Sequence, residues 1–442
     1  MSNNVAIIGA GWSGLIAAFK LVKAGVNVTI LEAAPQAGGR ARSINFAHNV
    51  LDNGQHICLG AYKTLIATLQ ELEIDASLVF HQHVFTYLAY HKNQKTYIQF
   101  PKIIYPLNLI VGLFSGKNLK IYDKIRIFLL CAKIKLNIVK TKNLSVADFL
   151  IKNQQSPHAI LHFWEPIALG AMTTKLPQAS AEVFVNVIQR FLGFKRKASD
   201  WLLFKSDLSE VFVEKITSKI QELGGVFFYH QNIKKLIKIN QSWQIDSAKN
   251  SFHAQHVIVT IPPWNLAKLL NNSFIGSHLA RNLEQLVAEK IITLYLEFDQ
   301  PITLSAPLIG FIGATAQWVF SRSITNQANL LAIVISSPDN LTSLNKENLL
   351  QAVLNDLKQL KKLPTLLNYK IIQEKRAAFC CDIQSQKLRP STQTNMDNFW
   401  LAGDYVANNL PATLEGALIN GVNAAGMVLK NYRLALNQFS DE

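Results

Sequence analysis

Residues 5–14 read VAIIGAGWSG, an apolar run that leads into the motif G-x-G-x-x-G. The run over 5–8 predicts a buried strand, and apolar residues at helical spacing follow it as far as Gly25. A second apolar run, residues 26–31, ends in Glu32, about twenty residues beyond Gly11. This order of strand, glycine turn, helix, strand and acid predicts a dinucleotide-binding unit with a Rossmann-like fold.

The residues of this motif have distinct predicted roles. The first glycine permits the tight turn, the second lets the backbone approach a pyrophosphate, and the third lets helix and strand pack closely. The helix N-terminus would offer free N–H groups and a positive dipole end to phosphates, while Glu32 would accept a ribose hydroxyl. The predicted phosphate-side residues are Gly9, Gly11, Trp12, Ser13 and Gly14.

The segment after the second strand narrows the choice of nucleotide. Residues 38–43 read GGRARS, which resembles the G-G-R segment that follows the fingerprint in flavin amine oxidases and carotenoid desaturases. In those families the segment lies along the pyrophosphate and flavin of FAD. Gly38 and Gly39 would let the main chain press on the cofactor, and Arg40 would neutralise phosphate. We therefore predict FAD, not NAD.

Composition restricts the class of protein. The chain has 442 residues, 49% of them hydrophobic and 17% charged, as expected of a globular protein with two or three lobes. Its four cysteines form no C-x-x-C motif and no disulfide framework, which favours a reducing compartment. With a strand starting at residue 5 and no spanning apolar segment, we expect a cytoplasmic protein without a signal peptide.

Nucleotide-domain signals recur along the chain. A long helical, apolar stretch covers 101–204. After it, the pattern of a nucleotide-binding domain returns, with a helical segment that ends at Gly224-Gly225 and apolar runs at 226–229, 256–260 and 398–402. We expect an α/β fold in which a Rossmann-like FAD-binding domain of the glutathione-reductase type is interleaved with a mixed-sheet substrate domain and a helical cap. The predicted FAD-binding parts are 1–58, 208–285 and 393–442; the substrate domain, whose first part carries the cap, is 59–207 and 286–392.

The net charge of +15 is unevenly distributed. Residues 102–142 hold nine basic residues and one acid, interleaved with aliphatic side chains. This pattern predicts a helix that lies on an anionic membrane surface, at the inner face of the cell membrane. A solvated face of an ordinary helix is the alternative. Nucleic acid is disfavoured, because the interleaved residues are aliphatic and the chain already commits to a flavin.

A second candidate cofactor segment lies near the C-terminus. Residues 398–404 read NFWLAGD, and LPATLEGA follows at 410–417. Gly403-Asp404 would offer a carboxylate to ribityl hydroxyls. Thr413 is a predicted N-cap, so the helix starting at Leu414 would aim its N-terminus at the flavin N1/O2 edge and stabilise an anionic reduced flavin. An ordinary capped helix is the alternative. Because no second G-x-G-x-x-G exists, electrons must come from an external donor.

Several internal motifs resemble those of the hydroxysqualene dehydroxylases, a squalene-associated, FAD-dependent, desaturase-like family. The matching segments span nearly the whole chain: DNGQH at 52–56, GAY at 60–62, WEP at 164–166, ASD at 198–200, EKRA at 374–377 and LAGDY at 401–405. The sequence departs from the family pattern in the basic cap and at Cys380-Cys381. We expect Gly54 and Gln55 of the first of these segments also to contact the cofactor. The order of elements over 208–260 resembles the middle section of the flavin domain in two-domain flavin oxidases, which implies that the Ile233 main-chain amide meets the adenine.

The resemblance further implies reduction of hydroxysqualene, a polyprenyl substrate, to squalene on a bacterial route from farnesyl diphosphate toward hopanoids. An allylic hydroxyl is a poor leaving group, so the site needs a proton donor before hydride from flavin N5 quenches the allylic cation. His56 is the candidate acid, with Asp52 and Glu165 as rivals, and a purely structural histidine is equally compatible with the sequence. We expect no metal site.

Three other functions stay open from the sequence. A carotenoid or polyprenyl desaturase would run the hydride transfer in the opposite direction. A flavin amine oxidase would need an aromatic cage for an amine, which the sequence does not reveal. A basic, membrane-bound flavin scaffold without turnover is the non-enzymatic alternative. We expect FAD to be held without a covalent bond, because the sequence around Cys380 and Cys381 lacks the S-G-G-C-Y-like context of amine oxidases that tether flavin through cysteine.

Overall fold

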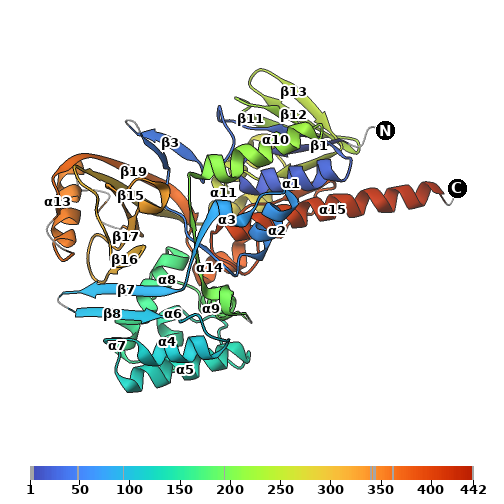
Figure 1. The fold of residues 1–442 in the computed structure, drawn as a ribbon. Helices are drawn as coiled ribbons and strands as arrows, with labels where there is room; N and C mark the ends of the chain where they lie inside the picture. Colours follow the sequence, from blue (N-terminus) through green and yellow to red (C-terminus); the bar gives the residue numbers. More distant parts are fainter. Residues whose placement is uncertain are drawn as a thin grey trace.

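The computed structural model describes residues 4–46, 49–92, 94–193, 195–338, 341, 345–360 and 363–440. In Figure 1 a smaller sheet with its helices occupies the upper right, a larger sheet lies at the left, and a group of helices lies below it. The chain passes between these regions several times, so the lobes are interleaved, as expected from the recurring nucleotide-domain signals.

The smaller sheet contains five parallel strands in the order β10-β2-β1-β14-β20. Its central strands are apolar because helices cover both faces of a parallel sheet. The strands are β1 (Asn4–Ile8), β2 (Asn27–Leu31), β10 (Val226–Phe228), β14 (His256–Val259) and β20 (Phe399–Leu401). They come from all three segments that the sequence assigns to FAD binding. The exact domain boundaries stay a prediction.

Two helices from opposite ends of the chain pack against each other beside this sheet. They are α1 (Trp12–Lys23) and α15 (Leu414–Ser440), which extends to the right in Figure 1. A methyl group on Gly421 of α15 would lie 2.3 Å from the Ser13 carbonyl oxygen of α1. Only a glycine therefore permits the two helices to pack this closely. Their packing brings the two predicted cofactor segments, from opposite ends of the chain, next to each other.

The remaining elements of this half surround the sheet. A π-helical turn (Ser209–Val213) precedes α10 (Glu214–Glu222), and α11 (Pro263–Ser273) and α12 (Ser277–Glu284) follow β14. A small antiparallel sheet is formed by β11 (Ile233–Ile239), β12 (Ser242–Ser247) and β13 (Ser251–Ala254). A separate hairpin joins β3 (Ser43–Phe46) to β4 (Asn49–Asp52).

The larger sheet has seven strands in the order β19-β15-β18-β17-β16-β7-β8 and is mixed, as expected, because only β16 and β7 pair in parallel. The helix α13 (Lys346–Leu357) buries its apolar face against it. The strands are β7 (Thr86–His91), β8 (Gln94–Gln99), β15 (Ala288–Phe298), β16 (Leu308–Phe311), β17 (Trp318–Ser321), β18 (Leu330–Ser336) and β19 (Leu366–Phe379).

The helical cap lies around and below β7 and β8 in Figure 1. Its helices are α4 (Leu107–Ser115), α5 (Ile121–Lys135), α6 (Val146–Lys152), α7 (Pro157–Ala159), α8 (Glu165–Met172) and α9 (Ala181–Leu192). The prediction of one helical stretch over 101–204 was wrong at its end. There β9 (Trp201–Phe204) pairs with β6 (Phe80–His83) and β5 (Cys58–Leu59), a contact between distant segments that overrides the local pattern.

The remaining described α-helices are α2 (Lys63–Glu71), α3 (Ala76–Val79) and α14 (Ile383–Leu388). Among all the helices that the structure describes, none is both long enough and apolar enough to cross a lipid bilayer.

Candidate active site

A cavity of about 540 Å³ lies where the ends of β1 and β2, the start of α1, the β20–α15 loop, β19 and α11 meet. Cofactor sites commonly have volumes of about 300–1,000 Å³ and lie beyond the carboxyl ends of parallel strands. Most of the side chains and glycines predicted to bind the cofactor line it. They are Gly9, Gly11, Trp12, Ser13, Glu32, Gly38, Gly39, Arg40, Ile233, Gly403, Asp404, Thr413 and Leu414.

Three predicted cofactor residues, Gly14, Gly54 and Gln55, are not among the lining residues. Gly14 has a packing role instead, because a methyl group there would lie 2.1 Å from the Gly9 carbonyl oxygen. Gln55 accepts a hydrogen bond from Arg322 Nη1 at 3.3 Å. Whether Gly54 and Gln55 contact a bound cofactor stays a prediction.

The glycine-lined end of the cavity has the features that a pyrophosphate requires. A methyl group on Gly39, whose φ is +62°, would lie 3.1 Å from the Gly11 Cα, so both backbones line the space closely. Gly11 is the N-cap of α1 and supplies no side-chain cap. The Ser13 hydroxyl beside it is buried and has no hydrogen-bond partner among the residues that the structure describes. Backbone amides, a helix dipole and an unpartnered hydroxyl therefore fit the phosphates of FAD.

Glu32 connects the glycine turn to the second strand. Its Oε2 accepts a hydrogen bond from the Ala10 amide and its Oε1 accepts one from the Ala34 amide, both at 2.7 Å. An ionised carboxylate has about four lone-pair sites, so two amides leave capacity for a ribose hydroxyl. The carboxylate thus both shapes the turn and faces the cavity, and the sequence predicted only the second of these roles.

We expect Glu32→Gln to weaken FAD binding about ten- to a hundredfold, because a charge-assisted hydrogen bond contributes about 1.5–3 kcal/mol. The glutamine side chain would also place its own N–H group against a backbone N–H donor, which is unfavourable. Titration of apoprotein with FAD measures the effect, and circular dichroism verifies that the variant is folded. Wild-type affinity would mean that Glu32 acts on the turn alone.

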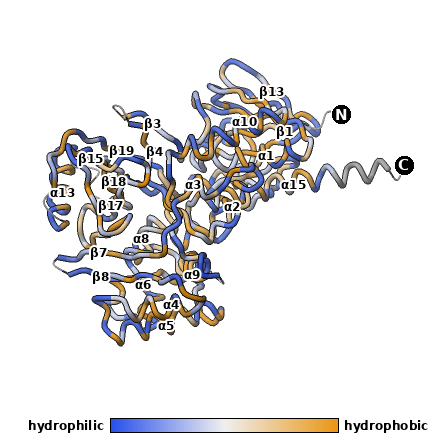
Figure 2. Tube along the Cα trace, in the orientation of Figure 1, coloured by the Kyte–Doolittle hydropathy of each residue, from blue (hydrophilic) through white to orange (hydrophobic). Residues whose placement is uncertain are grey.

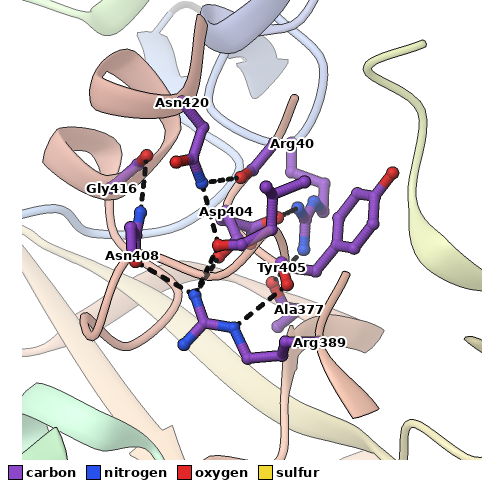
Figure 3. Close-up of polar contacts among 10 residues, drawn as sticks. Arg40, Ala377, Arg389, Asp404, Tyr405, Asn408, Gly416 and Asn420 are labelled. Carbon is purple, nitrogen blue, oxygen red and sulfur yellow. Dashed lines mark hydrogen bonds and ion pairs between the residues drawn. The ribbon is translucent and has the colours of Figure 1, made fainter. Parts of the chain in front are cut away.

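Arg40 and Asp404 form an ion pair that joins the two ends of the chain (Figure 3). Arg40 Nη2 lies 2.6 Å from Asp404 Oδ1, and Arg40 Nη1 donates to the Ala377 carbonyl at 2.8 Å. Both side chains are only partly buried and line the cavity. The pair therefore presents a cation suited to phosphate next to a carboxylate suited to sugar or ribityl hydroxyls.

The loop between β20 and α15 is held by hydrogen bonds from side chains of the loop and of α15. Thr413 Oγ1 accepts a hydrogen bond from the Gly416 amide at 3.0 Å, which confirms the predicted N-cap. Asn420 Nδ2 donates to the carbonyls of Gly403 (2.7 Å) and Val406 (2.9 Å). Because Thr413 and Leu414 line the cavity, the N-terminus of α15 faces it.

Of the three candidate acids, only His56 lines the cavity. Burial, together with the nearby charge of Arg40, lowers the pKa of His56 to about 4. The Asp52 carboxylate is buried elsewhere and accepts a hydrogen bond from the Leu208 amide at 2.8 Å, and burial raises its pKa to about 6. Glu165 is the first residue of α8 and is exposed.

Several lining residues were not predicted from the sequence. Asn265, Lys268 and Asn272 project from α11 at spacings of one helical face, a pattern that the sequence itself contains. Glu374 and Ala377 reach the cavity from β19, and Arg42, Asn53 and Gln231 from loops. Arg42, Asn53, Glu374 and Ala377 belong to motifs quoted above, but those motifs do not indicate that these four residues meet at one cavity, because that depends on contacts between distant segments.

Comparison with known proteins agrees with this geometry. Residues 12–429 match the family described as flavin containing amine oxidoreductase. Hydroxysqualene dehydroxylases of Rhodopseudomonas palustris and Sinorhizobium fredii are 28% and 26% identical to the chain, each over 97% of this chain and 99% of the relative. A crystal structure of an oxidoreductase from Methanosarcina mazei superposes with a TM-score of 0.75 at 18% identity, covering 95% of this chain and 99% of that one, which supports the fold.

The family match covers nearly the whole chain, and the cavity contains the groups that its flavin cofactor needs. The chain therefore belongs to the family of flavin-containing amine oxidoreductases and is an oxidoreductase with FAD as its cofactor.

Proposed function

We propose that the protein reduces hydroxysqualene to squalene, in squalene and hopanoid biosynthesis. The observation that carries the proposal is similarity over almost the entire length to two hydroxysqualene dehydroxylases, together with a cavity that joins both predicted cofactor segments. The physiological donor that reduces the flavin is external to this chain, because the sequence holds a single dinucleotide motif.

The reaction removes an allylic hydroxyl as water and replaces it by hydrogen. FAD, when bound and reduced, supplies the hydride. His56 donates the proton to the leaving oxygen. The Arg40–Asp404 pair lines the part of the cavity that binds the cofactor. Neutral imidazole is a weak acid, and burial is the main cause of the low pKa of His56. A phosphate beside Arg40 would offset the smaller contribution, which comes from the guanidinium charge.

The test is turnover by purified holoenzyme. Hydroxysqualene is supplied with a chemical or enzymatic reductant of flavin, and squalene is measured by mass spectrometry. Conversion that requires both protein and reductant supports the proposal. A polyprenyl desaturase would instead yield dehydrogenated product with an oxidant, an amine oxidase would consume amines, and a flavin scaffold would convert none of these compounds. Any of these results without squalene formation contradicts the proposal.

We also propose that FAD is held without a covalent bond. Cys380 and Cys381 are buried, do not line the cavity, and burial raises the pKa of both thiols, that of Cys381 to about 12. They therefore lack thiolate character at neutral pH. We expect acid precipitation to release all yellow colour into the supernatant; colour retained in the pellet would show a tether.

A further part of the proposal concerns where the enzyme meets a lipophilic substrate. Many of the exposed large apolar side chains lie on α4, α5 and the adjoining loops, and Figure 2 shows hydrophobic colour in this region at the lower edge. Ile104, Ile121 and Leu136 are 73%, 65% and 68% exposed. Basic residues alternate with them, which fits peripheral binding to the anionic inner face of the cell membrane.

Not every basic residue of the segment is free to meet lipid. Lys124 Nζ donates to the carbonyls of Phe114 (2.8 Å) and Gly116 (2.7 Å), so it ties α5 to the end of α4. The guanidinium of Arg126 lies 5.2 Å from the centre of the Tyr122 ring, which is itself 52% exposed. Lys117, Lys120, Arg126 and Lys133 are therefore the residues to change in a test of lipid binding, and Lys124 is left intact.

We expect the variant with Lys117, Lys120, Arg126 and Lys133 changed to Gln to lose most binding to anionic vesicles. Each cation near such a surface contributes about 1 kcal/mol, and salt screens the attraction over about 10 Å at 0.1 M. Co-sedimentation with and without anionic lipid measures the effect. A matched control changes Lys215, Lys219, Lys249 and Lys346, which lie outside the cap. Equal binding by the two variants would leave α5 as an ordinary cap helix.

A further inference from the structure

Arg389 is a buried cation that no part of the proposed chemistry uses. It follows α14 and is 6% exposed, yet no ion pair with a carboxylate is found for it among the residues that the structure describes. Burial lowers its pKa, and the charge of the nearby Asp404 carboxylate acts in the opposite direction without forming an ion pair with it. A guanidinium buried this deeply, without a direct salt bridge among the described residues, requires an explanation.

The guanidinium donates instead to the loop between β20 and α15 (Figure 3). Its Cζ lies 4.6 Å from the centre of the Phe379 ring, at the end of β19. The acceptors are the carbonyls of Tyr405 (3.0 Å from Nε), Leu410 (2.9 Å from Nη1), Asp404 (3.2 Å from Nη2) and Val406 (2.7 Å from Nη2), with Asn408 Oδ1 (3.0 Å from Nη2) and Gln386 Oε1 (3.2 Å from Nη1).

These bonds converge on the backbone that carries the second cofactor segment. On one side of the loop Asp404 meets Arg40, and on the other Asn408 Nδ2 donates to the Gly416 carbonyl in the first turn of α15 at 3.0 Å. Five N–H groups in a planar fork can satisfy several carbonyls of one tight loop at once, which a lysine ammonium cannot.

We propose that Arg389 is the positioning residue of the FAD site, which holds residues 404–410 so that Asp404 and the N-terminus of α15 both face the cofactor. The inference rests on FAD as the cofactor and does not depend on hydroxysqualene as the substrate. A shift of this loop would move the helix end away from the flavin and weaken its stabilisation of the anionic reduced form.

The test compares Arg389→Lys and Arg389→Gln with Gln386→Ala. The control removes one contact of the same guanidinium from α14 and leaves the loop untouched. Because Lys keeps the charge and loses the fork, we expect both Arg389 variants to bind FAD at least about tenfold more weakly, the equivalent of about one charge-assisted hydrogen bond. We also expect a changed visible circular dichroism of bound flavin and a lower two-electron potential, with Gln386→Ala like wild type.

A purely structural role would give a different result. Arg389→Lys would then lower the melting temperature of the apoprotein but keep wild-type FAD affinity, flavin spectrum and potential, and this would overturn the proposal. If neither Arg389 variant folds, Asn408→Ala decides, since it removes one acceptor of Arg389 and the link to Gly416. Weaker FAD binding by that variant supports the proposal, and wild-type binding refutes it.

Discussion

Replacing His56 by Gln should lower kcat for hydroxysqualene reduction about 10²- to 10⁴-fold, the contribution typical of a positioned acid. Glutamine retains a hydrogen-bond donor of similar size but cannot release a proton at neutral pH. The measurement is squalene formation under single-turnover conditions with prereduced enzyme. Because His56 lies in the same cavity as the cofactor, FAD content is determined in parallel, so that a loss of cofactor is not mistaken for a loss of acid.

The pH dependence provides a second readout of the same prediction. Burial and Arg40 lower the pKa of His56 to about 4, so the fraction of imidazolium grows as the pH falls from 8 toward that value. If His56 donates the proton, kcat/KM of the wild type rises over this interval and the profile of His56→Gln is flat there. A wild-type profile that falls with decreasing pH would contradict the assignment.

The rival acids give the control. Glu165→Gln leaves the cavity lining intact, since Glu165 is exposed at the start of α8. Its activity should match wild type within about threefold, a difference of well under 1 kcal/mol. A large loss in Glu165→Gln with normal activity in His56→Gln would transfer the role of acid to Glu165. Asp52→Asn is less informative, because the Asp52 carboxylate holds the Leu208 amide.

Gly11→Ala and Gly14→Ala should separate cofactor binding from folding. A methyl group on Gly11 would have Gly39 Cα at 3.9 Å as its nearest neighbour, an ordinary contact. The apoprotein should therefore fold with unchanged stability. The methyl group would project at the bound pyrophosphate, however, and an overlap of about 1–3 kcal/mol corresponds to a loss of about ten- to a hundredfold in FAD affinity.

Gly14→Ala should have the opposite effect. Its methyl group would lie 2.1 Å from the Gly9 carbonyl oxygen and 2.8 Å from Thr260 Oγ1, so α1 would be pushed off β1. We expect the free energy of unfolding to fall by about 3 kcal/mol, at the upper end of overpacking costs. Thermal melts of both apoproteins and FAD titrations measure the contrast. Normal FAD affinity in Gly11→Ala, or normal stability in Gly14→Ala, would contradict these roles.

In the basic segment over 102–142, residues of the same type have different roles that the composition does not distinguish. Charge and aliphatic content predicted a basic apolar surface, and the structure has exposed apolar residues there. The same count included Lys124, whose ammonium is engaged by two carbonyls at the end of α4. Sequence spacing cannot distinguish a lysine that is free to meet lipid from one that is bound by the protein. The carbonyls that bind Lys124 are free of helical hydrogen bonds only because α4 ends next to this side chain.

By itself the sequence determined the elements whose signals are local. The glycine turn, the helix after it and the acid at the end of β2 are all specified within residues 4–32, and Thr413 caps α15 through a bond to a residue three positions away. Local geometry follows from backbone sterics and short-range hydrogen bonds, so nearby residues are sufficient to predict it.

Only the tertiary structure decided which distant groups meet. Arg40 pairs with Asp404 across 364 positions, and Arg389 holds the loop behind Asp404. Two residues of the motif DNGQH also lie in different places. His56 lines the cavity, whereas Asp52 is buried against the segment that follows β9. Such contacts depend on strand register and on the packing of segments far apart in the chain, which leave no periodic signal in the sequence around either partner.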